Sequence, residues 1–339
     1  MMATASVRNS SIELLRIFTI GSVLLGHSFG HGAHGSVPYD SLMSMLGVCI
    51  NTFVLISGYY GINLRVKSFL NLTGMVLFYS LLSSLLNIVI FQGGVNVNYI
   101  VSAFLPISHN HFYWFISCYL ILMLLSPLIN RGLQALSNQN ILLIIGILVY
   151  INCITGWLFK NGINSNGFNT MQMIFMYVVG HGLHRFDTEK KGKLVYWLIA
   201  YVVLSVLNML TSEYLPERFS GYNNPLVVLK SIVAFCIFLR IHFQSKIVNR
   251  IAACVFPCYL LQEGAAGLSF YDIQYQVWEL LQNPLYYWCF ANICVIGFFV
   301  LSMLLEPIRK LCMNQINDRL YTTLKLHRID DILNNTTKL

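Results

Sequence analysis

Two ionisable side chains, Arg16 and His27, stand near opposite ends of the apolar stretch RIFTIGSVLLGH. They are eleven residues apart, a spacing that is only about 20° more than three full helical turns, so both lie on one helix face. The axial distance between them is about 16 Å, roughly half the hydrocarbon thickness of a bilayer. A guanidinium binds anionic groups such as phosphates, and an imidazole transfers protons near neutral pH. One helix would therefore carry an anion-binding group and a general base at its two ends.

Both residues also have ordinary explanations. Arg16 could extend to the inner headgroups, and His27 could be a satisfied polar residue at the outer interface. Glu13 lies one turn before Arg16, where it is expected to pair with the guanidinium and hold it in place. We take His27, Arg16 and Glu13 as the candidate catalytic residues.

The histidines that follow raise the alternative of a metal site. His27, His31 and His34 have the spacing i, i+4, i+7, which on a continuous helix would place three nitrogens on one face and could bind zinc. The stretch FGHGAHGSVP is rich in glycine and ends in proline, so the helix is expected to fray near Gly30. We therefore expect no metal site, and expect His31 and His34 in an exposed loop.

The composition places these residues in a membrane protein. Hydrophobic residues make up 56% of the chain and charged residues 10%, with a mean hydropathy of +0.65, so there is too little charge to cover a water-exposed surface. A membrane-spanning helix needs about 20 mostly apolar residues. Ten stretches have this character: 12–30, 42–64, 69–91, 112–129, 140–158, 170–184, 194–211, 224–243, 251–268 and 285–305. The stretch 170–184 is the shortest, and without it the C-terminus would change sides.

The basic residues predict the orientation of these spans. With the N-terminus inside, all but three of the 21 Lys and Arg fall on the cytoplasmic side, the exceptions being Lys160, Arg218 and Lys230. This bias predicts that both termini are cytoplasmic. It also explains the net charge of +8 as topology and attraction to anionic lipid, so no nucleic-acid partner is expected. A cleaved signal peptide is the alternative for the first stretch, but its removal would spoil the charge bias.

We therefore expect an all-α polytopic membrane protein with about ten transmembrane helices. Residues 1–11 would form a cytoplasmic N-terminal segment, and 12–305 one membrane domain. Residues 306–339 would form a cytoplasmic tail, whose first part could be an amphipathic helix on the inner leaflet.

Four stretches carry a family resemblance: ELLRIFTIGSVLLGH, NTFVLISGYYG (51–61), HFYWFISCYLILMLLSPLIN (111–130) and PCYLLQEG (257–264). The first has an arginine, ten residues and a histidine, and the second ends in an SGY turn. The third is a histidine-aromatic-Trp-Phe helix with a terminal proline. As an ordered set they resemble the acyltransferase-3 family of integral membrane acyltransferases. Many relatives have a histidine in the fourth stretch where this chain has Gln262 followed by Glu263, so that histidine's role does not transfer.

The resemblance implies a reaction. An acyl group, usually acetyl, would move from cytoplasmic acyl-CoA to a hydroxyl of an envelope or capsular polysaccharide or a lipid-linked sugar, in the plasma membrane or a bacterial inner membrane. Acyl-CoA would be a co-substrate, and no tightly bound cofactor is expected. Arg16, Arg65 and Lys67 would contact the anionic CoA, although positive-inside anchoring also explains Arg65 and Lys67. His27 would remove the proton of the acceptor hydroxyl.

A second group of residues is expected to contact the acceptor. His111, Tyr113 and Trp114 lie on the predicted outer side, before the fourth span, although an aromatic belt at the interface also explains Tyr113 and Trp114. Glu263 is the fourth candidate. Lys230, within the eighth span, could extend outward or pair with Glu263.

A transporter or flippase for a lipid-linked sugar or a small metabolite is the second functional class. Ten helices and scattered charges suit it, but the sequence shows no pair of broken helices in matching halves, as inverted repeats often do. A scaffold role is the third class, which the charged helix face argues against. The sequence carries no signal for an oligomeric state.

Overall fold

The computed structural model describes residues 9–34, 39–95, 97–105, 113–160, 163–164, 166–215 and 218–335. Every regular element within these ranges is helical, which confirms the predicted all-α class. In chain order the elements are α1 (Ser10–His27), η1 (Ser28–Gly32), α2 (Tyr39–Leu46), α3 (Cys49–Tyr60), α4 (Val66–Ile90), α5 (Val97–Phe104), α6 (Trp114–Ala135), α7 (Asn138–Val149), η2 (Tyr150–Leu158), α8 (Thr170–Arg185), η3 (Thr188–Lys190), α9 (Leu194–Tyr214), α10 (Pro225–Leu239), α11 (Lys246–Ala252), α12 (Val255–Gln262), α13 (Ala265–Leu281), α14 (Pro284–Thr323) and α15 (His327–Asn335).

Fewer than ten helices in the described part of the chain are long enough to span a membrane by themselves. Among the described residues, seven helical stretches are long and apolar enough to cross a bilayer, or eight if a bent pair counts as one span. That pair joins Lys246–Gln262 to Ala265–Leu281 at an angle of 75°. Helices α8 and α10 coincide with expected spans but have only 16 and 15 residues. The predicted count of ten is therefore not confirmed.

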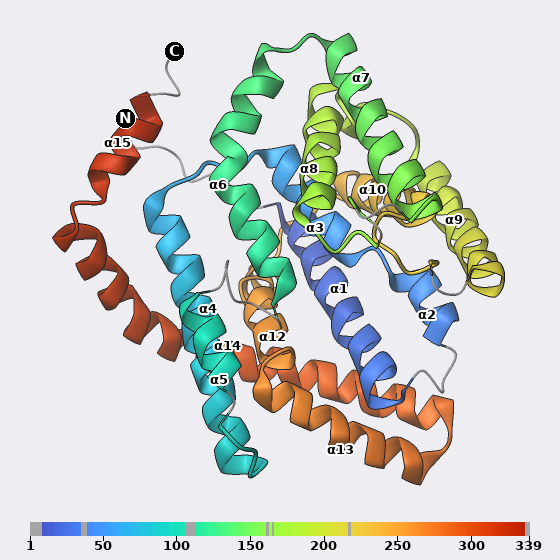
Figure 1. Cartoon of the computed structure of the whole chain (residues 1–339). Coiled ribbons are helices and arrows are strands. Elements are labelled where there is room, and N and C mark those ends of the chain that lie inside the picture. Colours follow the sequence, from blue (N-terminus) through green and yellow to red (C-terminus); the bar gives the residue numbers. More distant parts are fainter. Residues whose placement is uncertain are drawn as a thin grey trace.

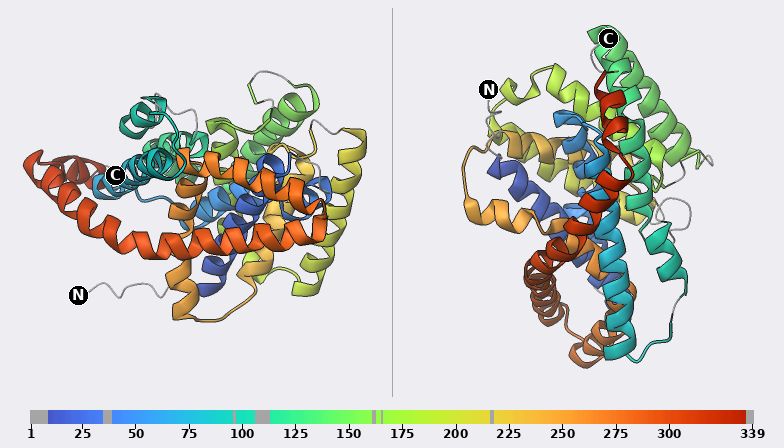
Figure 2. Two further views of the ribbon diagram at one scale, coloured as in Figure 1. Left: turned by 90° about the horizontal axis from the view of Figure 1, so that it is seen from below. Right: turned by 90° about the vertical axis from the view of Figure 1, so that its left-hand side faces the viewer.

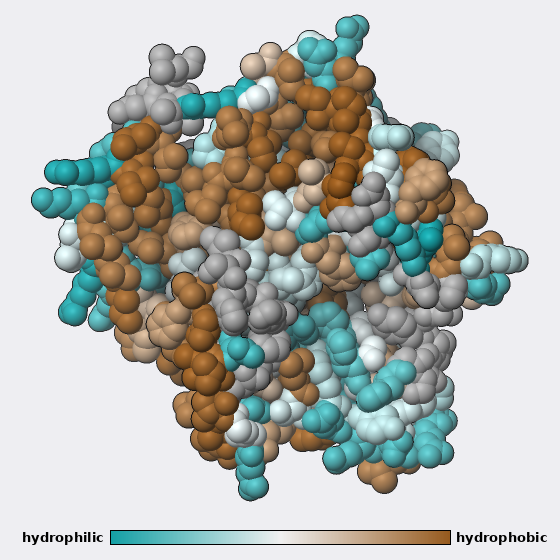
Figure 3. Space-filling model, viewed as in Figure 1, coloured by the Kyte–Doolittle hydropathy of each residue, from teal (hydrophilic) through white to brown (hydrophobic). Residues whose placement is uncertain are grey.

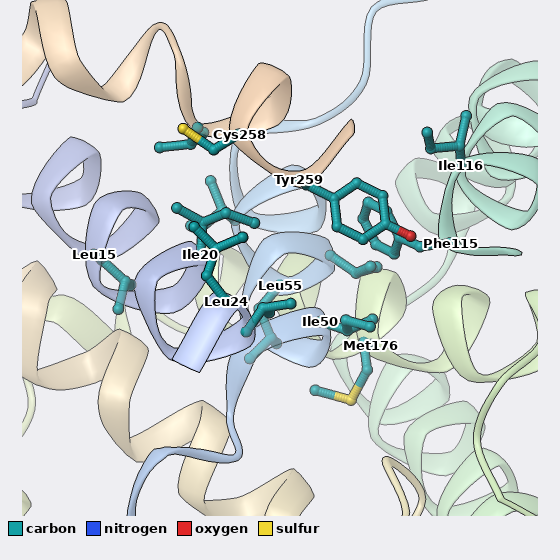
Figure 4. Packing of buried hydrophobic residues seen from close by; sticks show 14 of the residues in the cluster. Leu15, Ile20, Leu24, Ile50, Leu55, Phe115, Ile116, Met176, Cys258 and Tyr259 are labelled. Atoms are coloured by element: carbon teal, nitrogen blue, oxygen red, sulfur yellow. The ribbon is translucent and has the colours of Figure 1, made fainter. Parts of the chain in front are cut away.

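Helix α1 lies at the centre of the bundle (Figure 1). About two thirds of its span is buried inside the protein (67%), against 11% for α9 at the periphery. It contacts α2, α3, α10, α11, α12 and α14, and Leu15 and Leu24 on it are fully buried. Figure 4 shows these side chains facing Leu55 of α3 and Cys258 of α12. Because α1 forms the core, its removal as a signal peptide would dismantle the fold.

Two glycines let α3 and α8 cross at very short distance. A Cβ added to Gly58 would lie 2.1 Å from the carbonyl oxygen of Tyr177, and one on Gly180 would lie 2.4 Å from that of Leu55. Small residues at such crossings allow the backbones of membrane helices to approach closely. The crossing fixes the end of α3 that carries the SGYYG sequence.

Polar contacts join several helix ends at one end of the bundle. Ser11 donates to the Phe238 carbonyl, Tyr59 donates to Glu189 and Arg240 donates to the Thr188 carbonyl. All of these segments are ones that the charge bias assigns to the cytoplasm. The orientation of the protein in the membrane stays a prediction.

Labelling of introduced cysteines tests that orientation. Asn166 is exposed in the loop before α8, whereas the neighbouring Asn164 is fully buried. We expect Asn166→Cys to react with an impermeant maleimide from outside intact cells, and Gly192→Cys to react only after permeabilisation. The parent protein serves as the control because Cys289 and Cys312 are exposed. Reversed labelling of the two variants would invert the topology.

Helix α14 is unusually long. Its 40 residues span about 60 Å, and the helix continues through Pro307 without a break. The predicted boundary between membrane domain and tail, at 305/306, falls inside it. Figure 2 shows α14 passing across the bundle and leading to α15. Glu306 and Arg309 on α14 form a buried bidentate pair with both distances 2.8 Å, and Tyr79 of α4 donates to the same carboxylate.

The outward surface of the bundle is apolar. Large side chains such as Leu128 on α6 and Leu143 on α7 are 73% and 62% exposed, and Figure 3 shows hydrophobic residues covering both helices. Water-soluble monomers rarely carry patches of this extent. This surface fits contact with lipid tails.

Candidate functional site

His27 ends α1 and is followed directly by the π-helical turn η1. A π turn leaves a backbone carbonyl without its usual α-helical partner, and such turns are frequent at functional sites. Here Tyr287 of α14 donates its hydroxyl to the carbonyl of Ser28 at 2.9 Å. A Cβ on Gly32 would lie 2.6 Å from that same hydroxyl, so only glycine fits. The expected fraying near Gly30 is therefore wrong, because α14 holds the segment in a helical turn.

Glu263 lies beside His27. The bend between α12 and α13 places its Oε1 2.7 Å from Nδ1 of His27. Tyr271 of α13 donates to the same Oε1 at 3.1 Å. Lys230, for which the sequence suggested Glu263 as a partner, donates instead to the carbonyl of Ser44 at the end of α2. The bend thus brings a carboxylate to the histidine, and the predicted pairing of Glu263 with Lys230 is wrong.

His27 and Glu263 open onto a small cavity. Its volume is about 80 Å³ and it is largely enclosed. Most of the wall is aromatic, formed by Phe53, Trp114, Phe115, Phe168, Tyr222, Phe256 and Tyr259. Figure 4 shows Tyr259 reaching from α12 toward Phe115 of α6 across this region. A general base and its carboxylate partner therefore face a confined apolar space, where water is scarce and charges act strongly.

The predicted acceptor residues separate into different environments. Trp114 lines the cavity. Tyr113 does not, because it is fully buried and its hydroxyl donates to the carbonyl of Leu260, joining α6 to α12. Tyr113 thus packs between α6 and α12, and its contact with the acceptor stays a prediction. His111 lies outside the described residues.

Arg16 occupies the opposite end of α1. Its Nη1 lies 3.3 Å from Oε1 of Glu13, so the predicted pair is present. The side chain of Arg16 is 37% exposed and that of Glu13 only 10%, so the guanidinium is reachable while its partner is held in the protein. The arginine and the histidine are separated along α1 as the spacing predicts.

Two adjoining cavities lie at the Arg16 end, beside the SGYYG turn. One of about 360 Å³ is lined by Asn63, Asn130, Arg131 and other residues, and one of about 240 Å³ is lined by Tyr59, His181, His184 and others. Both include Tyr60, Gly61, Asn130 and Gln134 in their walls. Together they form a polar recess large enough for a small-molecule group.

None of the three basic residues predicted to bind the donor, Arg16, Arg65 and Lys67, is part of the lining of this recess. Arg65 is exposed at the start of α4, and Lys67 pairs with Asp318 of α14 at 2.8 Å. Arg131, one residue after the proline-containing stretch 111–130, is the cation in the lining. No sequence pattern selects Arg131, because its approach to the SGYYG turn depends on how α6 packs against α3 and α8.

Comparison with known protein families identifies the class of enzyme. The chain matches the family model described as "Acyltransferase domain", of the acyltransferase-3 type, over residues 9–305. The chain belongs to the acyltransferase-3 family. Searches of curated proteins and of solved structures gave no significant match. The resemblance drawn from the sequence is thus confirmed, and the protein is a multi-pass membrane acyltransferase rather than a transporter.

At Gln262, where the family resemblance suggested a histidine, this acyltransferase has an amide. The side chain is fully buried, and its Nε2 donates to the carbonyl of Leu24 at 2.9 Å. Leu24 lies one turn before His27 on α1. Gln262 therefore fixes α12 against α1 beside the histidine, and Glu263 next to it supplies the ionisable group.

The histidines of the acyltransferase do not converge on a metal position. The rings of His27 and His31 are 5.7 Å apart, and His31 and His34 stack on Tyr271 and Tyr275 of α13 at 5.1 and 4.3 Å. Within the described part of the chain, no three His, Cys, Asp or Glu side chains are grouped as metal ligands. His31 lies in η1 rather than in a loop, which corrects the expectation for that residue.

Proposed function

We propose that the acyltransferase moves an acyl group, typically acetyl, from cytoplasmic acyl-CoA to a hydroxyl of an envelope or capsular polysaccharide or its lipid-linked precursor. The membrane concerned would be the plasma membrane or a bacterial inner membrane. The observation that carries the proposal is the contact between His27 and Glu263 in a confined cavity, on the same helix as the exposed Arg16. Family membership supplies the reaction class.

His27 would act as the general base. Its Nδ1 faces Glu263, which leaves Nε2 to take the proton of the acceptor hydroxyl. The acceptor oxygen then forms an ester bond with the acyl carbon, and the bond from that carbon to the CoA sulfur breaks. The imidazolium returns the proton to the departing thiolate. Glu263 stabilises the transient imidazolium, and Tyr271 holds the Glu263 carboxylate in position.

The donor would enter from the Arg16 end. CoA carries several phosphates, and an arginine forms charge-assisted bonds with them. The recess beside the SGYYG turn, with Arg131 in its wall, offers space for the nucleotide part. The phosphopantetheine arm is long enough when extended to cover the axial distance of about 16 Å from Arg16 to His27. The acyl group would thus reach the acceptor hydroxyl without either CoA or the glycan crossing the membrane.

The direct test is acyl transfer by purified protein in proteoliposomes. Acetyl-CoA labelled in the acetyl group is supplied on one side and a glycan acceptor on the other. We expect labelled ester on the glycan and release of free CoA in equal amount. Label from acetyl phosphate or an acyl carrier protein, but not from acetyl-CoA, would replace the donor in this proposal.

Loss of the guanidinium at Arg16 should weaken the donor complex. A charge-assisted hydrogen bond contributes about 1.5 to 3 kcal/mol, so Arg16→Ala should raise the dissociation constant of a CoA analogue by about 10- to 150-fold. Single-turnover transfer at saturating donor should stay close to the normal rate. Lys190→Ala is the matched control, because it removes a cation that is 78% exposed, is paired with Asp187 and is not among the residues expected to contact CoA. Unchanged affinity in Arg16→Ala would show that the residue only anchors α1 at the interface.

A further inference from the structure

Three aromatic rings from separate parts of the chain meet over the His27 cavity. Trp114 begins α6, Phe168 lies in the loop before α8, and Tyr222 lies in the turn before α10. Their ring centroids are 4.8 Å apart for Trp114 and Phe168, 4.9 Å for Phe168 and Tyr222, and 5.9 Å for Trp114 and Tyr222. All three line the cavity together with His27 and Glu263. We call them the aromatic cluster.

The aromatic cluster keeps the cavity too small for a substrate. The volume of about 80 Å³ compares with about 300 Å³ or more for pockets that hold small organic ligands. The side chain of Phe168 contacts both other rings and is itself 51% exposed. Phe168 therefore separates the cavity from the surroundings of the protein.

The two loops of the cluster differ in how firmly they are held. The carbonyl of Tyr222 accepts from Asn51 and from Gln172, both at 2.8 Å, so its turn is fixed to α3 and α8. The loop of Phe168 reaches that turn through the carbonyl of Asn166, which accepts from the Tyr222 amide at 3.1 Å. Gly167 between them has a φ of +80°, and a Cβ there would lie 2.8 Å from the Cβ of Tyr222. Tyr222 is thus anchored by buried amides, whereas Phe168 lies on the exposed side.

We propose that the aromatic cluster is the subsite for a sugar ring of the acceptor. Phe168 swings outward, the ring stacks between the aromatic faces, and one of its hydroxyls points to His27. A pyranose suits this place because its C–H face is apolar and matches an aromatic face, while its hydroxyls radiate from the edge of the ring. This inference rests on the proposed acyl transfer to a glycan and names the residues that select it.

Substitutions at Phe168 separate stacking from simple plugging. Phe168→Leu keeps an apolar side chain but removes the ring, and Phe168→Tyr restores a ring. The control is Phe159→Leu, because Phe159 is 71% exposed at the end of η2 and is not part of the cavity wall. The acceptors are 4-nitrophenyl glycosides of glucose, galactose and N-acetylglucosamine, and glycerol serves as an acceptor alcohol without a sugar ring.

We expect Phe168→Leu to raise the KM for the glycosides about tenfold, the equivalent of about 1.4 kcal/mol. The rate with glycerol and the affinity for CoA should stay unchanged, and Phe168→Tyr and Phe159→Leu should behave as the parent. Calorimetry, which needs no turnover, should show the same tenfold loss of affinity for these glycosides. The subsite is therefore tested even if the parent protein transfers no acyl group. Absence of transfer would contradict only the proposed function.

Three results would overturn the subsite. An unchanged or lowered KM for the glycosides in Phe168→Leu would mean that the side chain only plugs the cavity. A change in preference for acyl chain length, with unchanged glycoside binding, would mean that the aromatic cluster holds the acyl group of the donor. Absence of glycoside binding to the parent protein would also contradict it.

Discussion

Replacing His27 with alanine is expected to slow acyl transfer by about 10²- to 10⁴-fold, as the loss of a general base commonly does. Binding of a CoA analogue should remain normal, because the cations expected to contact CoA lie at the other end of α1. The two quantities are measured side by side, as single-turnover transfer and as the dissociation constant of the analogue.

His31→Ala is the matched control for this change. It removes the same side chain one turn further along, where the ring stacks on Tyr271, and it should leave transfer within a few-fold of normal. An equal loss of CoA affinity in His27→Ala and Arg16→Ala would mean that the shared face of α1 serves helix packing and not catalysis. A fully active His27→Ala would end the catalytic assignment.

Glu263→Gln should lower kcat by a similar factor, about 10²- to 10⁴-fold. An amide keeps the size of the side chain but cannot stabilise the imidazolium through its charge, and the corresponding change in serine proteases costs about 10⁴ in kcat. The KM for the acceptor should change little if Glu263 works through His27. The kcat and the acceptor KM, measured at saturating acetyl-CoA, distinguish action of Glu263 through His27 from direct contact with the acceptor.

The hydroxyl of Tyr271 provides a graded comparison. Tyr271→Phe removes one hydrogen bond to the Glu263 carboxylate, and a bond to a charged group is worth about 1.5 to 3 kcal/mol, so kcat should fall less than in Glu263→Gln. If Glu263→Gln instead raises the acceptor KM and leaves kcat unchanged, Glu263 contacts the acceptor, as the sequence first suggested.

The sequence predicts local features of this protein well. The spacing of Arg16 and His27, and the pairing of Glu13 with Arg16, follow from helix periodicity within one segment, and both appear as expected. The apolar stretches mark most of the long helices and single out 170–184, the place of α8, as the shortest. However, α13 lies mostly beyond the stretch 251–268, and hydropathy could not show that α10 is short or that α14 runs on through Pro307. Those properties depend on neighbouring helices, which cover polar positions that a single segment would leave in lipid.

The site itself depends on contacts between distant parts of the chain. His27 and Glu263 meet because α12 ends at Gln262 and α13 starts at an angle of 75°, and no periodicity encodes that meeting. Phe168 and Tyr222 lie in loops without any pattern that points to a substrate. Arg131 reaches the polar recess only through the arrangement of α6. The sequence predicted His27, Glu263 and Trp114 as site residues, but not the other residues of the cavity wall.

The π turn after His27 sets the angular phase of the chain that follows it. Each residue of a helix advances the chain by about 100° around the axis, and a π turn holds more residues than an α turn. Removing a single residue, for example Gly30, would let the turn close as ordinary α-helix and would rotate His31 and everything after it by about that angle. Arg16 and His27 would keep their places, while Gly32 would leave the surface of α14 that it now fits. The number of residues in this turn, and not only their types, therefore determines how the chain after His27 is rotated relative to α1.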